Sequence, residues 1–346
     1  MFVAVDIVIH LLWLIGGLAL LYFGAEWLVK GASEIALRLG ISPLVVGLTV
    51  VAFGTSMPEL FVCLKANSPQ VIAVPAGWVG WEIAVGEASP DMALGNVVGS
   101  NIFNIALILG VAALIRPIVV HSQLIKRELP ILLVASAVFV GMMSDMALER
   151  WEGMILVMGI LFYIAANLRL SKRARYTQER YEEFEKAAIE CSRQGRARLW
   201  IDVGLVIFGI GALVLGSDWL VVHGESLALY FGVPEVIISL TLFALGTSLP
   251  ELATTVVASF KKQGDIITGN AIGSCIFNLL FVLGATAGIR PLKAGALSWL
   301  DLSVMMGLAV LIIPLMGSSM KLSRVEGVIL TTAAIVYATV VIMWQR

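Results

Sequence analysis

Charged residues are scarce in this chain, and the few that it has nearly balance. Asp, Glu, Lys and Arg make up 14% of the 346 residues, whereas an ordinary soluble domain carries about 25%. The formal net charge is −1, so the chain has no basic domain of the kind that binds a phosphate backbone. This shortage excludes nucleic acid as a partner and disfavours a water-soluble fold.

Cysteine and histidine are sparse as well. The three cysteines are widely spaced, odd in number and without a CxxC pair: Cys63, Cys191 and Cys275. The three histidines are equally scattered: His10, His121 and His223. This pattern indicates neither a disulfide framework nor a zinc site, and each histidine is best interpreted as a loop or helix-end residue. We therefore predict no cofactor, no transition metal and no obligate protein partner.

Apolar residues, in contrast, are in excess. They make up 59% of the chain, and the mean hydropathy is +0.96. A membrane-spanning helix needs about 20 predominantly apolar residues. Ten such runs are present: 5–29, 41–64, 92–115, 127–144, 151–168, 200–222, 233–258, 266–289, 297–316 and 325–344. The first run lacks a preceding basic region, so it is predicted to be a retained helix and not a cleaved signal. The expected fold class is an all-α membrane protein with ten transmembrane helices.

Lysine and arginine set the expected orientation. Cytoplasmic loops are enriched in both, and placing both termini outside puts 18 of the 23 such residues on the cytoplasmic side. The polar stretch 169–199 then becomes a cytoplasmic linker, and an insertion at about 66–90 becomes extracytoplasmic. Trp78 and Trp81 in this insertion are interpreted as interface anchors. We predict a multi-pass protein of the plasma membrane, the inner membrane of a bacterium.

The sequence also repeats itself. Two motifs each occur twice. The first is GTSMPE at 54–59 and GTSLPE at 246–251, and the second is GNVVGSNIFN at 95–104 and GNAIGSCIFN at 269–278. The offsets are 192 and 174 residues, and such duplication indicates two units, which we place at 1–168 and 200–346. Each unit holds five predicted helices, an odd number, so the second copy is inverted. Inverted repeats are typical of secondary transporters that bind substrate near the bilayer midplane.

A proline interrupts an apolar helix in each copy of the first motif. Pro58 and Pro250 cannot donate a hydrogen bond to the carbonyl four residues earlier, so both helices are predicted to be kinked or locally unwound there. The main-chain oxygens released in this way are costly in hydrocarbon unless they face protein, water or an ion.

Oxygen-bearing side chains accompany each break. They are Thr55, Ser56, Glu59, Ser100 and Asn104 in the first half, and Thr247, Ser248, Glu251, Ser274 and Asn278 in the second. An ionisable group inside a membrane span is a functional-site hypothesis by default, and two facing carboxylates repel each other unless a cation lies between them. Calcium binds six to eight oxygen ligands, with bidentate carboxylates among them. The pattern therefore indicates a calcium site whose flanking oxygens can hold Na⁺.

These motifs resemble the paired alpha repeats of the calcium/cation antiporter superfamily, in particular its prokaryotic sodium/calcium exchanger branch. The resemblance covers nearly the whole chain apart from the linker and the insertion. It implies that Glu59 and Glu251 are the central calcium ligands, aided by main-chain oxygens of Thr55 and Thr247. It implies sodium sites, with Asn104 and Asn278 close by, at Ala52, Ser56, Ser100, Ala244, Ser248 and Ser274. The first and sixth helices would form a sliding gate pair, and exchange would be electrogenic.

Three positions depart from the family pattern. Asn278 stands where some relatives, including potassium-dependent ones, have aspartate, which argues against potassium co-transport. Cys275 replaces the asparagine found at Asn101 in the first copy, and Cys63 replaces a small hydroxyl residue. Both cysteines are expected to affect packing more than ion choice.

The predicted function is Na⁺/Ca²⁺ antiport, with Ca²⁺ and Na⁺ as substrates, and the chain is not expected to be an enzyme. Paired buried glutamates can also carry protons, so H⁺/Ca²⁺ or potassium-dependent exchange stays open as the alternative. A cation channel also uses acidic and carbonyl oxygens, although glutamates on broken helices favour alternating access. A hydrolase with the glutamates as acid and base would lack any HExxH motif or nucleophile elbow.

Overall fold

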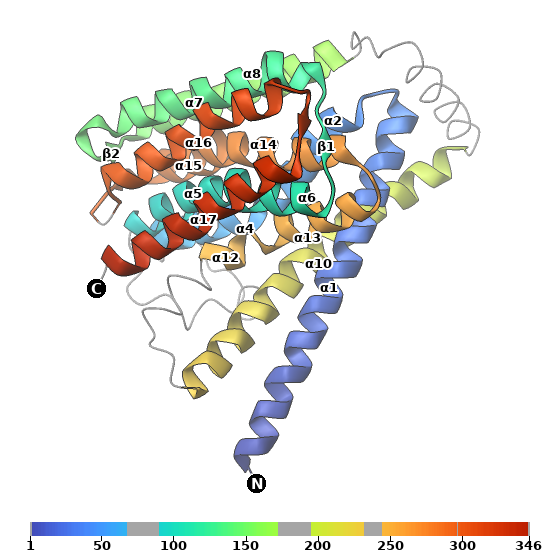
Figure 1. The fold of residues 1–346 in the computed structure, drawn as a ribbon, viewed down its shortest axis with the longest axis vertical. Coiled ribbons are helices and arrows are strands. Elements are labelled where there is room, and N and C mark those ends of the chain that lie inside the picture. Colours follow the sequence, from blue (N-terminus) through green and yellow to red (C-terminus); the bar gives the residue numbers. More distant parts are fainter. Residues whose placement is uncertain (1, 68–89, 172–194, 232–243, 296, 345–346) are drawn as a thin grey trace.

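The chain is almost entirely helical (Figure 1) in a computed structural model that describes residues 2–67, 90–171, 195–231, 244–295 and 297–344. The described part contains four strands of two residues each; otherwise the all-α prediction is confirmed there. The predicted interface anchors Trp78 and Trp81, and residues 172–194 of the predicted linker, lie outside the described residues.

The two halves are made of the following elements. The first half contains α1 (Phe2–Leu39), α2 (Pro43–Val46), the π-helix η1 (Gly47–Val51), α3 (Ala52–Thr55), α4 (Met57–Asn67), α5 (Pro90–Phe103), the π-helix η2 (Asn104–Ile108), α6 (Leu109–Ile115), β1 (Ile118–Val119), the π-helix η3 (Leu124–Glu128), α7 (Leu129–Met142), the 3₁₀-helix η4 (Met143–Asp145), β2 (Ala147–Leu148) and α8 (Arg150–Ser171). The second half contains α10 (Gly195–Tyr230), α12 (Ala244–Thr247), α13 (Leu249–Phe260), α14 (Gly264–Phe277), the π-helix η6 (Asn278–Val282), α15 (Leu283–Ile289), β3 (Leu292–Lys293), α16 (Trp299–Gly317), β4 (Lys321–Leu322) and α17 (Arg324–Trp344).

Equivalent elements recur at equal intervals. The stretch α5–η2–α6 spans 90–115 and α14–η6–α15 spans 264–289, and every boundary within them is displaced by 174 residues. The strands form two antiparallel pairs, β1 with β4 and β2 with β3. Because β3 and β4 are the counterparts of β1 and β2, each half supplies one strand to each pair. The duplicated sequence therefore folds into duplicated structure.

Helices α1 and α10 lie side by side and project from the rest of the molecule (Figure 1). They contain 38 and 36 residues, so the predicted ranges 5–29 and 200–222 are too short. Polar residues do not end these helices because they find partners within the pair: Arg38 Nε donates to Asp202 Oδ2 at 2.6 Å. At 1.5 Å per residue each helix is roughly 55 Å long, which exceeds a hydrocarbon core of about 30 Å.

Several helices suit a membrane. Among the described residues, six are long and apolar enough to cross it: Ile7–Leu39, Met92–Ile115, Arg198–Tyr230, Gly264–Ile289, Trp299–Gly317 and Arg324–Val341. The bent pair Pro43–Thr55 and Met57–Asn67 gives a seventh span if it is counted as one. The chain is thus a helical membrane protein, while the number of ten spans stays a prediction.

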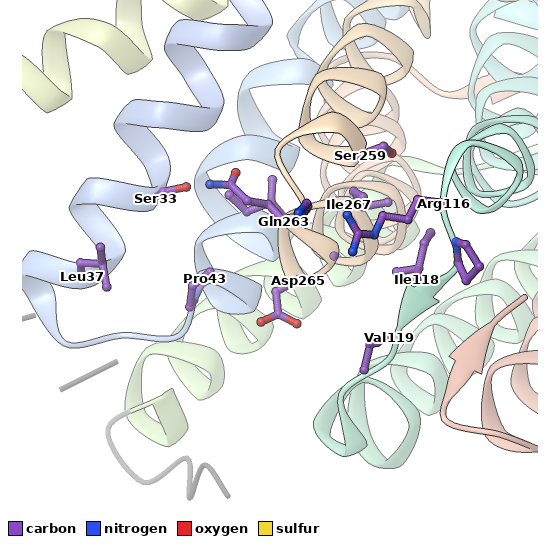
Figure 2. A pocket seen from close by; sticks show the side chains of 14 residues that line it. Ser33, Leu37, Pro43, Arg116, Ile118, Val119, Ser259, Gln263, Asp265 and Ile267 are labelled. Atoms are coloured by element: carbon purple, nitrogen blue, oxygen red, sulfur yellow. The ribbon is translucent and has the colours of Figure 1, made fainter. Parts of the chain in front are cut away.

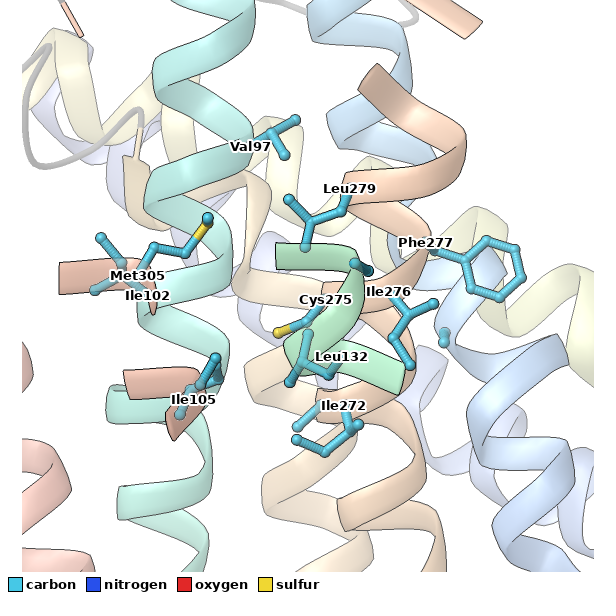
Figure 3. Packing of buried hydrophobic residues seen from close by; sticks show 14 of the residues in the cluster. Val97, Ile102, Ile105, Leu132, Ile272, Cys275, Ile276, Phe277, Leu279 and Met305 are labelled. Carbon is cyan, nitrogen blue, oxygen red and sulfur yellow. The ribbon is translucent and has the colours of Figure 1, made fainter. Parts of the chain in front are cut away.

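Helices α5 and α14 form the centre of the bundle. Buried residues make up 72% and 78% of the apolar stretches that contain them, compared with 17% in the first and last spans. Figure 3 shows Ile102 of α5 and Ile105 of η2 on one side of this core and Cys275 and Ile276 of α14 on the other. Polar side chains on α5 and α14 are consequently held in the protein interior, away from lipid.

Candidate cation-binding site

The first predicted helix break is present at Ser56. This residue separates α3 from α4 with φ −82° and ψ 5°, and the helical segments on either side of it are bent by 41°. Ser248 separates α12 from α13 in nearly the same conformation, with φ −89° and ψ 4°. Both breaks lie two residues before a proline, whose missing N–H cannot continue the helical bonding. The carbonyl of Gly246, four residues before Pro250, instead accepts a hydrogen bond of 2.5 Å from Ser217 Oγ on α10.

Each break is followed at once by a buried carboxylate. Glu59 lies in the first turn of α4 and Glu251 in the first turn of α13, and both are 0% exposed. The N-terminal end of a helix carries a partial positive charge, which favours a carboxylate there. The threonines four residues before them, Thr55 and Thr247, bond to the opposite half, so the two halves bring their acidic groups into one region.

Hydroxyl and amide groups of the two halves interlock around these carboxylates. Thr55 Oγ1 of the first half donates to Asn270 Oδ1 at 3.1 Å and lies 3.3 Å from Ser274 Oγ. In the mirrored arrangement, Thr247 Oγ1 of the second half donates to Asn96 Oδ1 at 3.2 Å and lies 3.3 Å from Ser100 Oγ. Each threonine beside a break therefore binds the central helix of the opposite half.

Asn96 and Asn270 were not among the predicted site residues. A signal for them was present, because each follows the first glycine of the GN motif and precedes the predicted Ser100 or Ser274 by four residues. That spacing places both side chains on the serine-bearing face of the helix. Their role as partners of Thr247 and Thr55 depends on the opposite half, which a local motif does not reveal.

Many oxygen atoms in this region have no protein partner. In the described part of the chain, the buried atoms without a hydrogen bond include Ser56 Oγ, both carboxyl oxygens of Glu59, Asn104 Oδ1, Ser248 Oγ, both carboxyl oxygens of Glu251 and Asn278 Oδ1. Buried polar groups almost always have a partner, because an unpaired one costs about 1–3 kcal/mol. A concentration of unpaired acceptors together with two carboxylates suits a cation.

The donor chemistry narrows the choice of cation. No group of three or more His, Cys, Asp or Glu side chains that could hold a metal exists among the described residues. The acceptors gathered here are carboxylate, hydroxyl and amide oxygens, which suit hard cations such as Ca²⁺. The residues therefore fit an oxygen-coordinated ion and not a thiolate or imidazole site.

The remaining predicted positions also border this region. Ala52 is buried at the start of α3, and its carbonyl accepts a hydrogen bond of 3.0 Å from the Ser56 amide. Ala244 opens α12 at the equivalent place. Cys63 donates from Sγ to Ala93 O at 3.4 Å, and Cys275 O accepts from Asn101 Nδ2 at 3.3 Å. The cysteines thus contact the central helices but lie beside the oxygen cluster.

A cavity lies apart from this oxygen cluster. It has a volume of about 440 Å³ and lies between α1, α2, the segment that includes Arg116, and the start of α14 (Figure 2). Ser33 and Arg116 reach it from opposite walls, with Gln263 between them. None of the predicted cation ligands lines it. The cation-binding hypothesis therefore rests on the buried cluster alone.

The match to a family model defines a class first: a helical membrane transporter of the cation antiporter type. The profile of the sodium/calcium exchanger protein family matches residues 9–169 and 201–343. The chain belongs to this family and hence to the calcium/cation antiporter superfamily, which consists of transporters and not enzymes. The resemblance seen in the motifs is thereby confirmed.

Individual relatives agree with this assignment over nearly their full length. The inner membrane protein YrbG of Escherichia coli (strain K12) is 36% identical over 329 residues, covering 94% of each chain. The sodium/calcium exchanger MaX1 of Methanosarcina acetivorans is 30% identical over 356 residues, covering 94% of this chain and 96% of MaX1. A solved structure of the sodium-calcium exchanger NCX_Mj matches with a TM-score of 0.77 and 25% identity, covering 95% of this chain and 97% of that one.

Proposed function

We propose that this chain is a secondary active antiporter that exchanges Na⁺ for Ca²⁺ across the inner membrane by alternating access. One observation carries the proposal: Glu59 and Glu251, fully buried and contributed by opposite halves, each follow a helix break whose threonine bonds to the opposite half. Two carboxylates in a low-dielectric interior repel each other strongly. A divalent cation between them removes this repulsion and is attracted by both negative charges.

Calcium would use the two carboxylates together with main-chain oxygens released beside the breaks. Thr55 and Thr247 end α3 and α12, so their carbonyls are at the point where regular helix stops. Their hydroxyls bind the opposite half, which holds both breaks in register with the carboxylates. Six to eight oxygens can be assembled in this way, as calcium requires.

Sodium would occupy the flanks of the same cluster. The proposed sodium ligands are Ser56, Ser100, Ser248, Ser274, the carbonyls of Ala52 and Ala244, and the nearby amides of Asn104 and Asn278. A monovalent ion needs less compensating charge, so hydroxyl, carbonyl and shared carboxylate oxygens suffice. Ions that share the two glutamates cannot all be bound at once, and this competition couples the release of Ca²⁺ to the entry of Na⁺.

The duplicated architecture supports the transport cycle. We place the units at 1–168 and 200–346, joined by the linker 169–199, as two inverted five-helix repeats with both termini extracytoplasmic. Pairing of β1 with β4 and of β2 with β3 ties the halves together around a pseudo-twofold axis. The projecting pair α1 and α10 would slide against this frame and open the site to each side in turn.

Flux measurements in proteoliposomes test the proposal. Uptake of labelled Ca²⁺ is expected with an outward Na⁺ gradient, and Glu251→Gln is expected to abolish it. Glu26→Gln is the matched control, because the Glu26 side chain is 37% exposed and forms an ion pair with Lys261 at the surface.

Further arms of the same experiment distinguish the alternatives. Uptake driven by a pH gradient without Na⁺ would reassign the chain to H⁺/Ca²⁺ exchange. A requirement for K⁺ would contradict the argument from Asn278. Unitary currents in a planar bilayer would indicate a channel. Undiminished uptake by Glu251→Gln would refute the site itself.

A further inference from the structure

Helices α1 and α10 meet along an antiparallel seam with a seven-residue repeat. Four opposed pairs follow the repeat: His10 with His223, Gly17 with Gly216, Gly24 with Gly209, and Gly31 with Asp202. A Cβ atom added at Gly17 or Gly24 would lie 2.9 Å from the opposite main-chain oxygen, so the two backbones approach as closely as small residues permit. The seam therefore sets the position of His10 and His223 as its outermost pair.

The two imidazole rings face each other across this seam. Their Nδ1 atoms are 2.9 Å apart, and the residues are separated by 213 positions in the sequence. Only one proton can lie between two nitrogens at this distance, so at least one ring presents a lone pair to the other. Both side chains are half-buried, which leaves the pair within reach of small ions from outside.

Aromatic packing holds the rings in place. Trp13, one turn after His10, stacks on His223 with ring centroids 5.3 Å apart and an interplanar angle of 11°. Trp13 also meets Trp219 edge to face at 4.4 Å, and Trp219 in turn packs within 3.2 Å of the position of a Cβ on Gly16. The His223 imidazole is thus oriented before any ligand arrives, and His10 is positioned through its contact with His223, which lowers the cost of binding.

We propose that His10 and His223 form a binding site for a divalent transition-metal ion, which would link α1 to α10. Neutral imidazole is a preferred ligand of copper, nickel and zinc. With metal–nitrogen bonds of about 2.1 Å, nitrogen atoms 2.9 Å apart subtend about 90° at the metal. This is the angle between neighbouring ligands in square-planar or octahedral coordination, so Cu²⁺ or Ni²⁺ fits better than tetrahedral Zn²⁺.

The site is chemically separate from the cation cluster. Its protein ligands are two nitrogen atoms, whereas the buried cluster offers oxygen atoms. Among the described residues no third His, Cys, Asp or Glu lies close enough to form a three-residue metal group with the two histidines. Water would therefore complete the coordination. The far end of the seam is already joined by the ion pair between Arg38 and Asp202. A metal at the histidines would close the opposite end.

Electron paramagnetic resonance of bound Cu²⁺ tests the proposal directly. Tag-free protein in detergent is titrated with Cu²⁺ in the Glu251→Gln background, which removes the oxygen site from competition. The expected spectrum shows hyperfine coupling to two imidazole nitrogens at one Cu²⁺ per chain. His10→Gln and His223→Gln should each lose this two-nitrogen signal, and both variants retain a polar side chain of similar size.

The third histidine supplies the control. His121 lies within 3.6 Å of Asp265 and far from the seam in sequence, so His121→Gln should leave the spectrum unchanged. The proposal is overturned if the Glu251→Gln protein shows no two-nitrogen species, if the signal survives when His10→Gln and His223→Gln are combined in that background, or if His121→Gln removes it. None of these outcomes depends on whether the chain exchanges Na⁺ for Ca²⁺.

Discussion

The carbonyls released at the two helix breaks differ in their hydrogen-bond partners. In the second half, Ser217 of α10 donates to Gly246 O. In the first half the equivalent position of α1, displaced by 192 residues, is Ala25, which has no hydroxyl to donate to Gly54. The same backbone break is therefore satisfied by a side chain in one copy and depends on other partners in the other.

The asparagines beside the site show the same asymmetry. Asn278 Nδ2 of the second half donates to Asn101 Oδ1 at 3.3 Å. The equivalent partner for Asn104 would be position 275, where Cys275 stands, and neither amide atom of Asn104 has a hydrogen-bond partner. Duplication thus supplies a common frame, and single substitutions decide which oxygens remain available to an ion.

Removing either carboxylate should cause the largest loss of Ca²⁺ affinity, and the loss should be the same for the glutamate of each half. Glu59→Gln and Glu251→Gln each delete one of two buried charges at 0% exposure. Loss of one member of a buried charged set costs about 2–5 kcal/mol, so Ca²⁺ affinity should fall by at least about thirtyfold. Isothermal titration with Ca²⁺ measures this. A loss confined to one variant would show that the ion is held by one half.

Replacing Asn101, the hydrogen-bond partner of Asn278, should have the second-largest effect. Asn101→Cys copies the second half into the first and leaves the buried Asn278 amide without an acceptor, at a cost of about 1–3 kcal/mol. Thermal unfolding of the purified protein should show a lowered midpoint. Cys275→Ser is the control, because Cys275 Sγ donates to Asn101 O at 3.8 Å, a bond that a serine hydroxyl can replace, while the bond from Asn101 Nδ2 goes to the main-chain oxygen of residue 275. An unchanged midpoint in Asn101→Cys would mean that the asparagine bond contributes nothing.

Alanine substitutions at Asn96 and Asn270 should differ by a smaller amount in their effect on stability. Asn96 accepts from Thr247 and also donates to Cys63 Sγ at 3.6 Å, whereas Asn270 Nδ2 has no partner. Asn96→Ala should therefore destabilise the protein more than Asn270→Ala, by about 0.5–1 kcal/mol. Comparing their unfolding midpoints cancels the common loss of volume. The reverse order would contradict the assignment of partners.

The smallest effect is expected from Ser217→Ala. This change makes the second break resemble the first and removes one hydrogen bond to Gly246 O, worth about 1 kcal/mol or less. Ser226 on the same helix donates to Val222 O four residues earlier, a local bond within one helix, so Ser226→Ala serves as the control and should have almost no effect. Equal shifts in the two unfolding midpoints would show that the released carbonyl does not need Ser217.

Local chemistry accounts for what could be predicted in advance. The missing N–H of Pro58 and Pro250 predicts a break wherever these residues stand, and the break is found at Ser56 and Ser248. The repeated GTS motifs likewise indicate that two carboxylates belong to one kind of site. Helix ends were harder, because Arg38 in the last turn of α1 bonds to Asp202, which lies 164 residues away in the sequence.

The sequence by itself determined the membrane character of this protein and its two-fold duplication, because apolar runs and repeated motifs can be recognised without knowing which residues meet in space. Only the tertiary structure decided that Thr55 binds Asn270, that Thr247 binds Asn96, and that His10 faces His223. These contacts join residues more than 140 positions apart, so their existence depends on how the two halves of the chain pack together.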